Sequence, residues 1–149
     1  MSRVIVLDAG PLGLITNPRA TPSAMACREW VVRRLSDGNV FLVSEISDYE
    51  IRRELIRAGK SAGLARLDAF NSQVVGRYLP ITTAVMHHAS ELWAQARTRG
   101  TPTADPKELD ADVILAASAL SVKHQNVIVA TANVGHLGQF VAADLWQNI

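Results

Sequence analysis

The chain opens with the stretch Val4-Ile5-Val6-Leu7-Asp8-Ala9-Gly10-Pro11, in which four aliphatic residues lead into a carboxylate and a turn. A continuous apolar run of this length predicts a strand buried on both faces, as strands of parallel sheets are. Similar runs follow at Val40–Val43 and Val127–Ala130, with a shorter one at Leu79–Thr82 and an edge strand expected around Asp144-Leu145-Trp146. The chain therefore contains several short strands separated by longer segments.

Those longer segments carry the start and stop signals of helices. Thr21 followed by Pro22 is typical of an N-cap and a first helical position. Helices are predicted over 22 to about 36, from Ser44 or Ser47 to about 58, over 61 to about 75, over 84–99 and over 108 to about 123, with a break at Gly100-Thr101-Pro102-Thr103. Strands that alternate with helices indicate a three-layer α/β/α fold around a central, mainly parallel sheet.

Composition sets the limits on what the chain can be. Its 149 residues, 48% hydrophobic and 19% charged, suit one globular domain covering residues 1–149. A net charge of +1 neither requires nor forbids a nucleic-acid partner. The one cysteine, Cys27, excludes an internal disulfide and a cysteine-based zinc site, which fits a reducing cytoplasm. No apolar run is long enough to predict a membrane span.

Three carboxylates stand out because of where they fall. In α/β folds, ligands bind beyond the carboxyl ends of the strands, and Asp8 follows the first strand directly, although a simple turn also explains it. Asp112 lies in a helix that is apolar on nearly all sides, where a carboxylate needs a cation or donors to compensate its lost hydration. The alternative is a first-turn aspartate satisfied by free N–H groups. Asp110 lies on the opposite side of that helix and is expected to be solvated.

Glu50 is the third candidate, early in the helix that follows the second strand. Ser47-Asp48-Tyr49-Glu50 also fits a capping box, which explains Glu50 without function. Carboxylates that gather at one sheet edge raise one another's pKa and need a cation. Oxygen-only ligands favour Mg²⁺ or Mn²⁺, which orients a phosphodiester and activates a water for in-line attack.

Taken together, these stretches resemble the PIN-domain family, and within it the VapC-like toxins of type II toxin–antitoxin modules. The matching stretches are residues 4–12, 43–55, 110–119 and 129–137. The third, Asp110-Ala111-Asp112 followed by small apolar residues, is the most specific. The main departure is Asn133, because that family position is often an aspartate.

The resemblance implies a Mg²⁺- or Mn²⁺-dependent ribonuclease. Asp8, Glu50 and Asp112 are then the catalytic, metal-binding acids, with Asp110 as a further metal ligand. Asn133 and Ser44 are expected to support the site. For the toxin branch, the resemblance also implies a homodimer and a cognate antitoxin whose tail blocks the site.

Weaker signals surround this set. Arg52, Arg53 and Arg57 form a basic helix side that suits RNA phosphates, although a solvated face explains it as well. The scattered tryptophans are interpreted as core or interface residues rather than as a platform for bases.

Two other classes of protein compete with the nuclease. The first is a non-catalytic PIN-like module that binds RNA or protein, its metal site weakened by Asn133. The second is a phosphotransfer enzyme of the strand-aspartate type, which ranks lower: a haloacid-dehalogenase-like enzyme has a second aspartate where this chain has Gly10, and a receiver domain has an acidic pair that this chain lacks.

Overall fold

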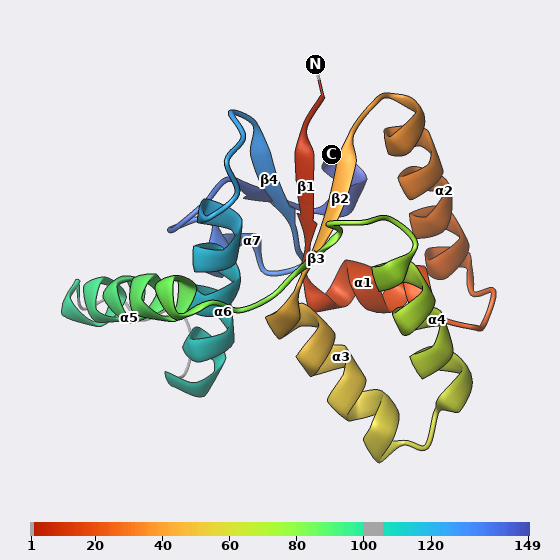
Figure 1. The fold of residues 1–149 in the computed structure, drawn as a ribbon, viewed down its shortest axis with the longest axis horizontal. Helices are drawn as coiled ribbons and strands as arrows, with labels where there is room; N and C mark the ends of the chain where they lie inside the picture. The colour runs from red at the N-terminus through yellow and green to blue at the C-terminus, as the bar shows by residue number, and fades with distance from the viewer. Residues whose placement is uncertain (1, 100–105) are drawn as a thin grey trace.

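The computed structural model describes residues 2–99 and 106–149, and it has a five-stranded parallel sheet at its centre. The strand order is β3-β2-β1-β4-β5 (Figure 1). The strands are β1 (Val4–Leu7), β2 (Val40–Ser44), β3 (Tyr78–Leu79), β4 (Val127–Ala130) and β5 (Ala143–Asp144). The expected α/β class and parallel sheet are confirmed.

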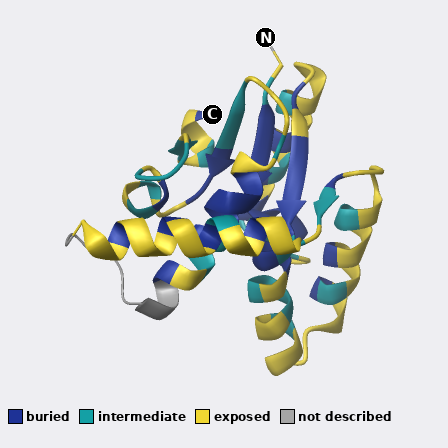
Figure 2. Cartoon of the chain, turned by 60° about the vertical axis from the view of Figure 1, so that its left-hand side comes forward, coloured by how far each residue is buried: buried dark blue, intermediate teal, exposed yellow. Residues whose placement is uncertain are grey.

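The central strand β1 explains why the fold needs two covering layers. All four of its residues are buried, and they alternate between the two faces of the sheet. Val4 and Val6 belong to one hydrophobic core, whereas Ile5 and Leu7 belong to another. A strand that is apolar on both sides can be stable only with helices on both faces, and Figure 2 shows β1 and β2 as buried along nearly all of their length.

The helices divide between these two cores. They are α1 (Ala9–Thr16), α2 (Pro22–Ser36), α3 (Glu45–Arg57), α4 (Ser61–Ser72), α5 (Thr83–Thr98), α6 (Pro106–Leu120), α7 (Val134–Leu137) and the 3-10 helix η1 (Trp146–Asn148). Side chains of α1, α2 and η1 pack on one face, and those of α5, α6 and α7 pack on the other. Helices α3 and α4 extend beyond the carboxyl ends of the strands (Figure 1).

Most predicted elements agree with the structure to within a few residues. Thr21 caps α2 as predicted, since its side chain accepts from the Ala24 N–H at 3.2 Å. The third strand is shorter than expected because Thr82, predicted to be its last residue, instead caps α5 and accepts from the Val85 N–H. The predicted break at 100–103 lies outside the described residues. In the part of the chain that is described, no helix has the length and apolarity needed to cross a bilayer.

Helix α1 was not predicted. Asp8-Ala9-Gly10-Pro11 has the composition of a turn, but here Asp8 is the N-cap and Pro11 occupies the first turn of a helix. The first four N–H groups of a helix have no partner within it, so a proline there removes no helical hydrogen bond. The four residues Asp8 to Pro11 suit a turn and the start of a helix equally well, which is why the helix was not predicted.

Candidate active site at the carboxyl edge of the sheet

Asp8 lies at the middle of the sheet's carboxyl edge. Its strand β1 pairs with β2 on one side and with β4 on the other, which is where the strand order changes direction. One carboxylate oxygen, Oδ1, accepts from the Ala9 N–H at 2.7 Å, and Oδ2 accepts from the Thr131 hydroxyl at 2.7 Å. Thr131 follows β4, so donors from two strand ends hold the carboxylate in place.

Glu50 comes from α3, and the capping-box interpretation of this residue is wrong. The N-cap of α3 is Ser44, so Ser47 lies within the first turn and cannot cap the helix. Burial raises the pKa of Glu50 above its ordinary value. The negative charge of Asp8 raises that pKa further, Arg53 opposes the shift, and the charge of Asp112 adds to it. The two aspartates are therefore close enough to Glu50 to act on its charge.

Ser44 is the N-cap residue of α3, one of the two positions that the sequence offered, but its hydroxyl bonds elsewhere. Its side chain makes no cap hydrogen bond, and its hydroxyl donates to the Ser118 hydroxyl at 3.2 Å. Ser118 in turn donates to the Ile114 carbonyl at 2.8 Å. Ser44 thus ties the end of β2 to α6, the helix that carries Asp112.

Asp112 is largely buried, with 13% of its side chain exposed, and it lies 3.7 Å from the His136 ring (Oδ2 to Nδ1). This pair attracts only when the histidine is protonated. His136 belongs to α7, whose N-cap position is occupied by Asn133 without a side-chain cap bond. Asp110 is exposed at the mouth of the same cleft.

These groups line one cleft of about 590 Å³. Its lining residues are Ile46, Tyr49, Glu50, Arg53, Asp110, Ala111, Asp112, Ile114, Asn133 and His136. The structure therefore brings Glu50, Asp110, Asp112 and Asn133 together, with Asp8 at the strand end beside Glu50.

The chemistry of these donors fits a hard divalent cation. The acids supply oxygen ligands, and Arg53 is the one cation that offsets the negative charges acting on Glu50. Within residues 2–99 and 106–149, however, no three acidic, histidine or cysteine side chains converge as a ready-made metal site. Asp8 and Asp112 nevertheless lie close enough to Glu50 for their charges to act on it.

Of the three arginines expected on this side of α3, only Arg53 lines the cleft. Arg52 pairs with Asp48 through two nitrogens, at 2.9 and 3.0 Å, and with Asp68 of α4 at 2.6 Å. Asp48 is a buried residue of α3, and Asp68 lies on α4. Because Arg52 bonds to both, it joins the two helices. Arg57 forms an exposed pair with Glu54 at 2.8 Å.

Thr131 was missed by sequence reasoning. It is buried, and its hydroxyl donates to the Asp8 carboxylate and accepts from the Asn133 N–H at 2.9 Å. Thr131 therefore links Asp8 to the loop that carries Asn133. The rule that strand ends carry the site, applied to β4 as it was to β1, points to this residue.

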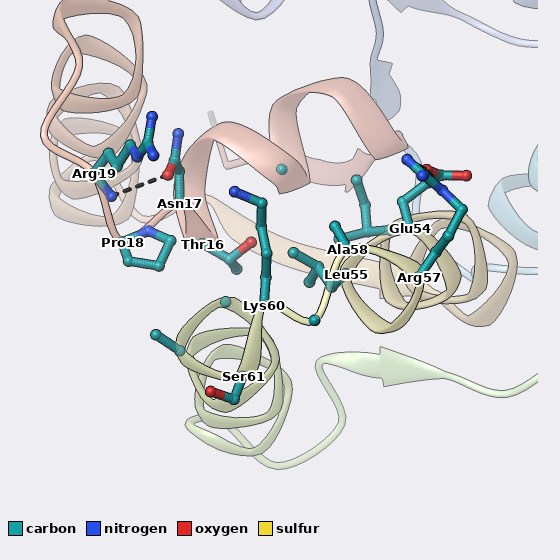
Figure 3. A pocket seen from close by; sticks show the side chains of 15 residues that line it. Thr16, Asn17, Pro18, Arg19, Glu54, Leu55, Arg57, Ala58, Lys60 and Ser61 are labelled. Atoms are coloured by element: carbon teal, nitrogen blue, oxygen red, sulfur yellow. Dashed lines mark hydrogen bonds and ion pairs between the residues drawn. The ribbon is translucent and has the colours of Figure 1, made fainter.

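A second, larger hollow of about 680 Å³ lies elsewhere, between α1, α3 and the start of α4 (Figure 3). Its wall includes Leu55, Ala58 and Thr16, with Arg19 and Lys60 among the lining residues. The carboxylate that lines it, Glu54, is paired with Arg57. Size favours this hollow, but the acidic chemistry lies in the other cleft, which is therefore the candidate active site.

Comparison with solved structures supports the fold. Over 96% of this chain and 98% of the other, it superposes on a chain of VapBC2 from Rickettsia felis bound to a DNA fragment from their promoter, with a TM-score of 0.70 and 16% identity. FitAcB from Neisseria gonorrhoeae gives a TM-score of 0.68 and 22% identity over 97% and 99% of the two chains. VapBC-1 from nontypeable Haemophilus influenzae gives 0.62 and 17% over 97% and 98%. No family model and no curated protein sequence matches the chain.

Proposed function

We propose that this chain, which shares its fold with chains of VapBC and FitAB complexes, is a metal-dependent endoribonuclease that hydrolyses RNA phosphodiesters with Asp8, Glu50 and Asp112. The observation that carries the proposal is the cleft that Glu50, Asp110 and Asp112 line together, with Asp8 close by. The raised pKa of Glu50, caused by burial first and then by the charges of Asp8 and Asp112, agrees with this clustering of acids. Three acids from three elements lie close enough to repel one another, at the edge of the sheet where α/β folds bind ligands.

Asp8, Glu50 and Asp112, together with Asp110, would hold Mg²⁺ or Mn²⁺. When bound, such an ion would supply positive charge and the Lewis acidity that activates a water for attack on a phosphodiester. The protein's own part is to position these groups. Thr131 and the Ala9 N–H orient the Asp8 carboxylate. Arg53, exposed at the cleft wall, can pair with a phosphate oxygen of the RNA.

Two side chains near α7 lie beside the acids. The Nδ1 of His136 lies 3.7 Å from Asp112 Oδ2, where the ring can help to position that carboxylate. Asn133 can contribute its amide oxygen or donate to a water, and it leaves the cleft one charge less negative than an aspartate does.

The test is cleavage of a mixed RNA by the purified chain with Mg²⁺, with Mn²⁺ and with chelator, beside Asp8→Asn and Asp112→Asn. The expected result is metal-dependent cleavage that both substitutions abolish while the circular dichroism spectrum stays unchanged. Arg57→Gln is a matched control, because Arg57 is exposed and outside the cleft. Cleavage that survives both aspartate substitutions places the active site elsewhere.

The alternative is a PIN-like module that binds RNA without cutting it. Asn133 favours this alternative, because PIN-domain proteins often have an aspartate at that position. RNA binding that persists in chelator, together with no cleavage under either metal, is the outcome that selects it.

We further propose that the chain works in the cytoplasm as the toxin of a toxin–antitoxin pair and forms a homodimer. The similarity to chains of VapBC and FitAB complexes supports an antitoxin partner. Expression of the chain is then expected to stop growth of the host cell, and co-expression of the partner is expected to restore it. Normal growth during expression of the active chain contradicts the toxin assignment but leaves the nuclease untouched.

A further inference from the structure

Two aromatic side chains stand apart from the others in this chain. Tyr49 on α3 is 54% exposed and Trp93 on α5 is 36% exposed, whereas every other tryptophan, tyrosine and phenylalanine is buried or half-buried. Single exposed apolar side chains are normal on a protein surface, so exposure alone does not set these two rings apart. What sets them apart is that each ring lines a hollow and has an arginine beside it.

Each of the two rings has an arginine guanidinium close to it. The guanidinium of Arg53 lies 5.0 Å from the centre of the Tyr49 ring, and that of Arg97 lies 5.6 Å from the centre of the Trp93 ring. In each case the arginine is four residues after the aromatic, on the same side of its helix. An aromatic face next to a cation is the combination that single-stranded nucleic acid uses, because bases stack on the ring and phosphates pair with the cation.

Both rings line hollows whose walls include residues of α6. Tyr49 lines the acidic cleft, and Trp93 lines a groove of about 380 Å³ formed by α5 and α6. The cleft and the groove share the lining residues Asp110 and Ile114, so they adjoin each other. The acids of the proposed metal site thus lie along a surface that has an aromatic–arginine pair on α3 and another on α5. Figure 2 shows the outer side of α5 as exposed along much of its length.

We propose that Tyr49 and Trp93 are stacking platforms for two bases of a single RNA strand, one on each side of the phosphate that is cut. This inference rests on the proposed nuclease function and adds the residues that would hold the bases of an unpaired strand by stacking. It also revises the interpretation of Trp93 as a core or interface residue, because its ring is exposed and lines a groove. Met86 and Val113 extend the apolar wall beside Trp93, which suits the flat face of a base. Asp110 lines both hollows and is exposed, so it is available to the metal or to base N–H groups.

The experiment measures RNA binding and RNA cleavage separately. Binding of a fluorescein-labelled, mixed-sequence single-stranded RNA is followed by anisotropy in chelator, for the unchanged chain and for Tyr49→Ala, Trp93→Ala, Tyr49→Phe and Trp93→Phe. Each alanine substitution is expected to weaken binding by roughly 5- to 150-fold, the loss of one stacked base, whereas each phenylalanine retains a ring and binds within about threefold of the unchanged chain. Val32→Ala, an exposed apolar residue on α2, is the control and is expected to bind normally.

A strand with abasic positions identifies stacking as the cause. Such a strand is expected to bind weakly and to lose little more when the ring is removed. Equal binding by the alanine variants and the unchanged chain overturns the proposal, as does a lack of RNA binding by the unchanged chain. Loss of self-association in Trp93→Ala without loss of RNA binding also overturns it at that position and assigns the groove to a second copy of the chain.

Failure of the platforms and failure of the nuclease are distinguishable. RNA cleavage that depends on Asp8 but not on either ring leaves the nuclease standing and removes the platforms. Ring-dependent RNA binding without metal-dependent cleavage removes the nuclease and leaves the platforms.

Discussion

Two acids on α3, only two residues apart, are expected to respond in opposite ways to loss of their charge. Asp48 is buried and receives hydrogen bonds from Arg52 Nε at 2.9 Å, from Arg52 Nη2 at 3.0 Å and from Asn71 Nδ2 at 2.8 Å. Burial raises the pKa of Glu50, and the charges of Asp8 and Asp112 raise it further. We predict that Asp48→Asn destabilises the fold with little effect on chemistry, whereas Glu50→Gln abolishes cleavage without destabilising the fold.

The magnitude for Asp48→Asn follows from its contacts. Removing one partner of a buried ion pair costs about 3–5 kcal/mol. Arg52 is 34% exposed and retains Asp68, so water and a second acid offset part of that cost. About 2 kcal/mol remains, which for a chain of this length lowers Tm by roughly 4–8 °C.

The sign for Glu50→Gln is the reverse. A carboxyl whose folded pKa is raised contributes stability that is complete below its unfolded value, near 4.5, and that is lost as pH rises through the folded pKa. Replacement by neutral glutamine is therefore expected to leave Tm at pH 7 equal or higher, and the advantage over the unchanged chain is expected to disappear at pH 4. Burial and the charge of Asp8 are the first causes of this behaviour.

The assay is thermal unfolding in chelator at pH 4 and pH 7, beside RNA cleavage with Mn²⁺ at 20 °C, well below both midpoints. The reasoning is refuted if Glu50→Gln unfolds more than about 1 kcal/mol more easily than the unchanged chain at pH 7, since Glu50 is then a structural residue. A stable Asp48→Asn likewise refutes the account of the Arg52 network.

Three further predictions concern the ordering of the site, the metal and the cysteine. Thr131→Val removes the hydroxyl that donates to Asp8, and it is expected to lower kcat by about 10- to 100-fold with little change in KM, as steady-state kinetics on RNA can check. Mn²⁺ at a hundred times its Kd is expected to raise the stability of the unchanged chain by about 2.7 kcal/mol in thermal unfolding, and Asp8→Asn is expected to lose most of that gain. Burial raises the pKa of the Cys27 thiol to about 12, so this thiol is expected to be inert to a disulfide reagent in the native chain and to react on unfolding in denaturant.

The parts of the fold that depend on local patterning were predictable. The strands Val4–Leu7 and Val127–Ala130 can be recognised in the sequence because they are continuous apolar runs. A strand covered on both faces has no reason to alternate apolar with polar residues. The start of α2 follows from Thr21 and Pro22 for an equally local reason. Helix α1 was hidden because the residues that open it are also the residues of a turn.

The parts that depend on partners from distant elements were not predictable. Asp8 and Thr131 are 123 positions apart, and nothing in either segment names the other. The composition of α3 suggests that Arg52 contacts RNA, but in the structure Arg52 pairs with Asp68, which lies 16 residues away on α4. Only packing of α3 on α4 shows that this cation serves the fold.

The position of α6 explains how one helix can serve structure and chemistry together. Its apolar residues, among them Leu115 and Ala116, fill a core against the sheet, which fixes the helix rigidly. Ser118 adds a hydrogen bond to the end of β2, directly before the helix that carries Glu50. Because both acids are anchored through that junction, the separation between Asp112 and Glu50 is set by the core rather than by the loops. Packing therefore holds the two acids near each other despite their like charges, and under the proposed function a bound cation is expected to relieve that repulsion.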